Sequence, residues 1–112
     1  MIHSLSAPQA HELLSRAQLD IVDIVDVREA HEWSSGHLPG ARFVPLDQLR
    51  ANPKASLPRD GVLFVCSAGM RSQTAARIAA AAGLTEIYNL SGGTRGWVKA
   101  GLPLMNGLSI AV

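Results

Sequence analysis

The sequence predicts an α/β domain built on a mainly parallel sheet. Short apolar runs rich in β-branched residues alternate along the chain with helical segments, as in βα units whose helices connect parallel strands. The run over residues 21–27 is apolar on both faces, which is typical of a strand buried within a parallel sheet. With 112 residues there is room for one domain, which we expect to span residues 1–112.

The first half of the chain contains two predicted strands. A hydroxyl at Ser6 followed by Pro8 marks a helix start, and Pro45 ends the second strand because proline has no N–H to donate. The predicted elements are, in order, a helix over residues 7–16, a strand over 21–27, a helical turn within 28–33, a loop over 36–41, a strand over 43–45 and a helix over 46–50.

The second half repeats the alternation. Two prolines predict a surface loop, Gly83 ends an alanine-rich helix, and Thr94 is expected to cap the last helix. The predicted elements are a loop over residues 52–60, a strand over 62–65, a helix over 72–82, a strand over 87–90, a turn over 91–93 and a helix over 94–100.

Charge and hydropathy argue against several classes of partner. Ten Lys and Arg against nine Asp and Glu give a formal charge of +1 without a basic block, so we expect neither nucleic acid nor an anionic membrane as a partner. The first residues lack a signal-peptide pattern and no apolar run reaches the length of a bilayer span, so we expect a cytoplasmic protein. The apolar residues 104–112 do not indicate an oligomeric state.

The chain has a single cysteine, Cys66, which excludes an internal disulfide and a zinc site built on several thiolates. His3, His11 and His31 have no metal-ligand spacing with one another or with Cys66. We therefore predict no metal and no cofactor.

Cys66 is the leading candidate for a reactive group. It follows the strand over 62–65, and ligands of open α/β sheets bind beyond the carboxyl ends of the strands. The small residues after it allow backbone N–H groups to curl into an anion-binding nest, with Gly69 supplying the backbone freedom. The next helix N-terminus and the Arg71 guanidinium favour a thiolate. Cysteine is also a common core residue, but the loop favours the reactive interpretation.

The segment Cys66-Ser67-Ala68-Gly69-Met70-Arg71-Ser72 resembles the active-site loop of single-domain rhodanese-like sulfurtransferases. The resemblance covers nearly the whole chain. Its other motifs are Asp26-Val27-Arg28-Glu29 with Glu32-Trp33, Gly36-His37-Leu38-Pro39-Gly40-Ala41, and Leu90-Ser91-Gly92-Gly93 with Trp97 and Gly101-Leu102-Pro103. It implies a rhodanese-like fold, with a central, mainly parallel, five-stranded sheet flanked by helices on both faces.

The resemblance also implies a sulfurtransferase whose cysteine becomes a persulfide. A donor such as thiosulfate or a protein persulfide would load the nucleophile, Cys66, and cyanide or a cellular thiol would take the sulfur. Arg71 would be the charged partner of the donor anion, and Ser72 would either donate to the persulfide or cap the helix. The residues that would bind the substrate are Ser67, Ala68, Gly69, Met70, Arg71 and Ser72.

Three further residues are assigned supporting roles. We expect Asp26 and Arg28 to form a salt bridge or hydrogen bonds that anchor neighbouring loops. His37 lies in a Gly- and Pro-bounded loop, where a hydrogen bond to backbone is the commoner role than that of a general base. Trp33 and Trp97 are expected to be core residues.

Two other functions remain open at this stage. Cysteine phosphatases and arsenate reductases also place a thiolate and an arginine around an anion, but the phosphatases resemble CxxxxxR, whereas only Ser67 to Met70 separate the two residues here. A non-catalytic rhodanese-like binding module often lacks the cysteine that this chain keeps.

Many family members have a basic or polar residue after the cysteine, whereas Ser67 and Ala68 leave Arg71 as the loop's one charge, so thiosulfate is not ranked above other donors. The loop also differs from the Cys-Gly-Ser-Gly-Val-Thr pattern of mercaptopyruvate-dependent members.

Overall fold

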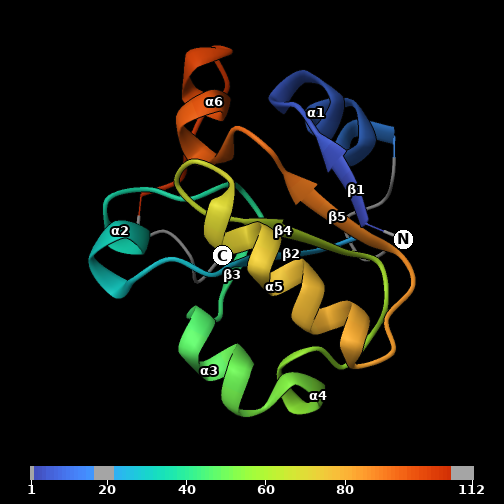
Figure 1. Ribbon diagram of the computed structural model, residues 1–112. Helices are drawn as coiled ribbons and strands as arrows, with labels where there is room; N and C mark the ends of the chain where they lie inside the picture. The colour runs from blue at the N-terminus through green and yellow to red at the C-terminus, as the bar shows by residue number, and fades with distance from the viewer. Residues whose placement is uncertain (1, 17–21, 107–112) are drawn as a thin grey trace.

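A computed structural model describes residues 2–16 and 22–106 of the chain (Figure 1). Within these residues, five strands form one sheet in the order β1-β5-β4-β2-β3, and every neighbouring pair is parallel. β4 lies at the centre of the sheet. The strands are β1 (Ile2–Leu5), β2 (Asp23–Asp26), β3 (Arg42–Phe43), β4 (Val62–Val65) and β5 (Ile87–Leu90).

Helices cover both faces of the sheet. α1 and α6 lie on one side, and α3, α4 and α5 lie on the other (Figure 1). This arrangement confirms the predicted α/β class with a parallel five-stranded sheet. The helices are α1 (Ala7–Arg16), α2 (Ala30–Ser34), α3 (Leu46–Ala51), α4 (Pro53–Ser56), α5 (Met70–Ala81) and α6 (Gly93–Lys99).

The central strand β4 supplies both hydrophobic cores, because successive side chains of a strand point to opposite faces. Val62 and Phe64 pack toward α5, whereas Leu63 and Val65 pack toward α1 and α6. All four side chains are fully buried. The face of α5 that meets the sheet is made of alanines, namely Ala75, Ala76 and Ala79. Their small side chains allow the helix to approach β4 closely.

Two segments differ from their predicted structure. No strand was predicted at Ile2–Leu5, which pairs with β5 at the sheet edge; its two central residues are exposed and polar, so the apolar signal of a buried strand is missing. The predicted loop over 52–60 contains the one-turn helix α4, which starts at Pro53 because proline suits the first helical position. Leu57 then enters the core.

Several boundaries also shift. α5 begins at Met70 rather than at residue 72, and β3 occupies residues 42–43 rather than 43–45. Thr94 lies inside α6 instead of capping it, since the helix already begins at Gly93. Residue 21 of the first predicted strand and residues 107–112 of the apolar tail lie outside the described residues.

The segment after α6 returns to the loop that follows α2. Met105 and His37 exchange backbone hydrogen bonds of 2.7 and 3.0 Å, and the Trp97 indole donates to the Pro103 carbonyl at 2.8 Å. Trp33 and Trp97 are both buried, as expected. Among the described residues, no helix is both long and apolar enough to cross a membrane.

A buried ion pair fixes the carboxyl end of β2. The Arg28 guanidinium donates two hydrogen bonds of 2.8 and 3.0 Å to Asp26 Oδ2 and one of 2.6 Å to the Gly36 carbonyl. Asp26 is fully buried and Arg28 is 5% exposed. The pair therefore ties the end of the strand to the loop that carries His37.

Replacing Arg28 with Met should destabilise the protein by about 3–5 kcal/mol, because it leaves the Asp26 carboxylate buried without its partner. Urea unfolding followed by circular dichroism would measure the loss. Arg50→Met is the matched control, because Arg50 pairs with Asp47 on the surface and its loss should cost at most about 1 kcal/mol. Equal effects of the two substitutions would contradict the structural role of the buried pair.

Candidate active site

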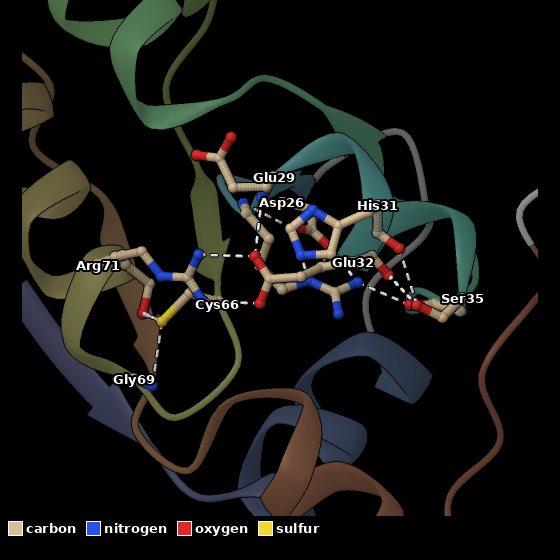
Figure 2. A network of polar contacts seen from close by, with 11 residues as sticks. Asp26, Glu29, His31, Glu32, Ser35, Cys66, Gly69 and Arg71 are labelled. Carbon is tan, nitrogen blue, oxygen red and sulfur yellow. Dashed lines mark hydrogen bonds and ion pairs between the residues drawn. The ribbon is translucent and has the colours of Figure 1, made fainter.

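Cys66 directly follows the central strand β4 and begins the loop that leads into α5. The side chain is 1% exposed. The Gly69 N–H donates to Sγ at 3.0 Å (Figure 2). The Ser72 hydroxyl oxygen lies 3.3 Å from Sγ. The N-terminus of α5, which is the positive end of the helix dipole, begins at the adjacent Met70. The backbone therefore curls around the sulfur as the sequence predicted.

These contacts change the acidity of the thiol. Burial raises the pKa of Cys66, because the charged thiolate is poorly solvated inside the protein. Hydrogen bonds from the Ser72 hydroxyl and from the backbone N–H groups of residues 68, 69 and 72 have the opposite effect. They outweigh burial, so the pKa of the Cys66 thiol lies below its ordinary value. A thiolate is the nucleophilic form of cysteine.

Ser72 connects the sulfur to Asn89 on the neighbouring strand β5. Its hydroxyl is fully buried between Sγ and the Asn89 side-chain carbonyl, to which it donates a short hydrogen bond. A hydroxyl carries one proton, so Ser72 donates to one acceptor at a time, either Asn89 or Sγ, and between Sγ and Oγ either atom can be the donor. Ser72 is thus an internal residue of α5 in contact with Cys66 rather than the helix cap.

Arg71 is not a free cation. Its guanidinium makes two hydrogen bonds with the Glu32 carboxylate, at 2.7 and 2.9 Å, and Figure 2 shows it reaching toward α2. The bond with Arg71 lowers the pKa of Glu32 to about 2, and the same bond raises the pKa of Arg71. The charge expected to receive a donor anion is therefore already paired.

The remaining predicted binding residues form the rim of the loop. Ala68 and Met70 are exposed, Met70 at 78%, whereas Ser67 is half-buried and Gly69 is buried. None of these four residues carries a charge. The loop between Cys66 and Arg71 therefore presents only small or apolar side chains.

The turn between β5 and α6 packs directly on the backbone of this loop. The Thr94 N–H donates to the Cys66 carbonyl at 2.8 Å, and the Arg95 N–H donates to the Ser67 carbonyl at 3.1 Å. A Cβ at Gly93 would overlap the backbone of Ser67, and a Cβ at Gly69 would overlap the backbone of Ser91. Both glycines have positive φ angles, 61° and 99°, which side chains disfavour. Only glycine fits at these two positions.

The supporting residues form a separate cluster beside the loop. Asp26 and Arg28 make the buried pair described above, and the Arg28 charge contributes to the lowered pKa of Glu32. His37 is buried, with its ring stacked on Trp33 at 3.6 Å between centroids and its Nδ1 3.2 Å from the Trp33 carbonyl. These contacts position α2 and the following loop rather than the sulfur.

Sequence reasoning missed the roles of Glu32 and Asn89. Glu32 follows β2 and Asn89 lies in β5, and both strands flank β4, so topology places both residues near Cys66. A polar Asn inside an apolar strand was the available signal for the second residue. No group of three or more His, Cys, Asp or Glu in the described part of the chain could hold a metal ion.

Comparisons of the sequence and of the fold with known proteins point to the same family. Residues 6–100 match the model of the rhodanese-like domain. A rhodanese-like domain protein from Staphylococcus aureus has a crystal structure that covers 93% of this chain and 99% of its own, with a TM-score of 0.76 and 27% sequence identity.

Two Bacillus subtilis proteins are similar in sequence. The one named "Uncharacterized protein YqhL" is 39% identical over 82 residues, which cover 73% of this chain and 65% of that protein. The one named "Putative sulfur carrier protein YrkF" is 32% identical over 76 residues, which cover 68% of this chain and 41% of that protein. The match thus spans less than two thirds of either relative.

Ser72→Ala should raise the pKa of the Cys66 thiol, because it removes a hydrogen bond to the thiolate, and a bond to a charged group contributes about 1.5–3 kcal/mol. The thiolate absorbance near 240 nm, titrated with pH against the Cys66→Ala protein as blank, would measure it. Ser15→Ala, which removes an exposed hydroxyl bonded to its own helix, should leave the titration unchanged. An unchanged pKa in Ser72→Ala would contradict the assigned contact.

Gly93→Ala should cost about 3 kcal/mol or more, because the added methyl group overlaps the backbone beneath Cys66. Gly101→Ala is the matched control, since Gly101 also has a positive φ but has open space around its Cβ position, and should cost about 1–2 kcal/mol. Urea unfolding of both variants would separate the effect of the overlap from that of the φ angle. A cost in Gly93→Ala no larger than the control's would refute the close packing.

Proposed function

The chain belongs to the rhodanese-like domain family, and on that premise we propose that it is a sulfurtransferase that carries a sulfane sulfur on Cys66. The observation that carries the proposal is the ring of hydrogen-bond donors around the buried sulfur, formed by backbone N–H groups and the Ser72 hydroxyl. Such donors stabilise a thiolate before the reaction and the anionic outer sulfur of a persulfide after it.

The first half-reaction loads the enzyme. The Cys66 thiolate attacks the sulfane sulfur of a donor such as thiosulfate, the new Sγ–S bond forms as the donor's S–S bond breaks, and the electron pair leaves with sulfite. No general base is needed because the thiol is already ionised to a larger extent than an ordinary cysteine. This agrees with the position of His37, whose contacts run to Trp33.

The second half-reaction returns the thiolate. A nucleophilic acceptor, either cyanide or a thiol, attacks the outer sulfur of the persulfide, and the electron pair returns to Sγ. The exposed rim at Ala68 and Met70 leaves the loop accessible to a donor and an acceptor in turn. The sulfur itself is the group carried, so the proposed cycle needs no cofactor.

The loop is less suited to phosphate chemistry. Four residues separate Cys66 from Arg71, one fewer than in the CxxxxxR pattern, and the Arg71 guanidinium is occupied by Glu32. A phosphatase needs its arginine for the equatorial oxygens of the phosphoryl group. The lowered pKa of the retained cysteine also favours a reactive role over a silent binding module.

Incubation with thiosulfate should increase the intact mass of the protein by one sulfur atom, roughly 32 Da, because one thiolate forms one persulfide. Cyanide should then remove the added mass and yield thiocyanate. The experiment is intact-protein mass spectrometry before and after each addition.

Cys66→Ala is the matched control and should never gain the sulfur, while keeping its circular dichroism spectrum. A cyanide-sensitive gain in Cys66→Ala would place the carrier elsewhere and refute the mechanism. Hydrolysis of p-nitrophenyl phosphate or reduction of arsenate by the same sample, with no sulfur gain from any donor, would favour the alternative function.

A further inference from the structure

This inference rests on the proposed function. We propose that the site prefers an organic sulfane donor to the dianion thiosulfate. The preferred donor, such as an organic persulfide or thiosulfonate, carries no more than one negative charge. Glu32 is the residue that determines this preference. The inference follows from the charges around the opening of the loop.

The opening has no net positive charge to attract a dianion. The one cation of the loop, Arg71, is bound at both terminal nitrogens by Glu32. The exposed Glu29, at the N-terminus of α2 close to Glu32, also interacts electrostatically with the Arg71 guanidinium. Arg71, Glu32 and Glu29 together carry a formal charge of −1, which the nearby exposed Arg95 brings to zero, and the Cys66 thiolate then makes the total negative. A second charge on the donor is therefore repelled rather than bound.

Glu32 is held in place, so Arg71 is not released easily. One Glu32 oxygen accepts the Glu29 N–H at 2.9 Å, which forms part of the capping box of α2, as well as an Arg71 N–H at 2.7 Å. The Glu32 pKa of about 2 keeps this carboxylate ionised throughout the neutral range. The pair is only partly exposed, with 21% of the Glu32 side chain accessible.

The other side of the opening suits an organic carrier. Met70 is 78% exposed and Ala68, two residues earlier, is also exposed, so the loop after Cys66 presents apolar surface to solvent. An organic group attached to the donor sulfur can remove this surface from water, whereas the sulfonate of thiosulfate cannot. Charge and hydropathy thus favour the same class of donor.

The transfer balances without a further reactant. The Cys66 thiolate attacks the outer sulfur of R–S–SH, the Sγ–S bond forms, the donor S–S bond breaks, and its electron pair leaves as R–S⁻. The transferred sulfur keeps its proton until solvent removes it. Sγ is oxidised to the persulfide level and the carrier sulfur is reduced to the thiolate.

The test compares thiosulfate with methanethiosulfonate, in which a methyl group replaces one charged oxygen. Rates of loading onto Cys66 are measured by intact mass, and each rate is divided by that of the same donor with 2-mercaptoethanol to remove intrinsic reactivity. Wild-type protein should prefer methanethiosulfonate by about tenfold at low ionic strength. The reason is that thiosulfate carries one more negative charge, which the negative charge at the site repels.

Glu32→Gln should lower this preference about fivefold by accelerating thiosulfate, because it frees the charge of Arg71 for the donor. Glutamine can still accept the Glu29 N–H, so α2 stays capped. Glu29→Gln removes the same formal charge without breaking the ion pair and should change the preference no more than about twofold. Circular dichroism of each variant verifies that it is folded.

Arg95→Gln controls for the other cation near the loop, whose backbone N–H binds Ser67. It should leave the donor preference unchanged. Three results would each overturn the assignment to Glu32: a wild-type preference for thiosulfate, an unchanged preference in Glu32→Gln, or a loss of thiosulfate loading in Arg95→Gln. Loading by either donor would still support the proposed sulfurtransferase function. Loading by neither donor would instead refute the proposed function.

Discussion

The candidate site depends on a contact between two stretches of backbone that leaves no space for side chains. The β5–α6 turn packs on the loop after Cys66. Positions 69 and 93 are glycines, because a Cβ at either position would overlap the backbone of the other stretch. Hydrogen bonds from Thr94 and Arg95 bind the carbonyl groups of Cys66 and Ser67 on that side of the loop. These bonds and the close approach at Gly69 and Gly93 fix the path of the backbone that carries the Gly69 N–H to the sulfur. Among the described residues, none of the hydrogen-bond donors around Sγ comes from a charged side chain.

This origin explains the electrostatic character of the site. The thiolate is stabilised by Ser72 and backbone N–H groups against the effect of burial, which raises its pKa. Backbone donors are fixed by the fold and need no reorganisation when the charge on the sulfur changes. Arg71, the residue that most resembles an anion receptor in the sequence, has its charge balanced by Glu32. The loop therefore holds one negative sulfur, and the charge of its own cation, Arg71, is balanced by Glu32.

Whether a feature could be predicted from the sequence depends on how far apart along the chain its interacting residues lie. The apolar run of β4 and the small residues after it are local signals, so the strand, the curled loop and the following helix were all predicted. β1 has polar, exposed central residues and gains its structure from pairing with β5 across the chain, which no local pattern records. The ion pair of Arg71 with Glu32 joins residues 39 positions apart. Its partners are ordinary charged residues until the β4–β2 pairing brings them together.

The two ion pairs near the site have different physical roles, and burial separates them. Asp26 and Arg28 are shielded from water, so their interaction is tied to the fold and to the loop that carries His37. Arg71 and Glu32 are partly exposed, with 37% and 21% of their side chains accessible, so water and ions can compensate a change there. A substitution in the first pair acts on stability, because it leaves a charge without solvent. A substitution in the second changes the electric field at Cys66, because Arg71 interacts electrostatically with the sulfur. The fold thereby separates the pair that anchors the loop after α2 from the pair that sets the charge beside the Cys66 loop.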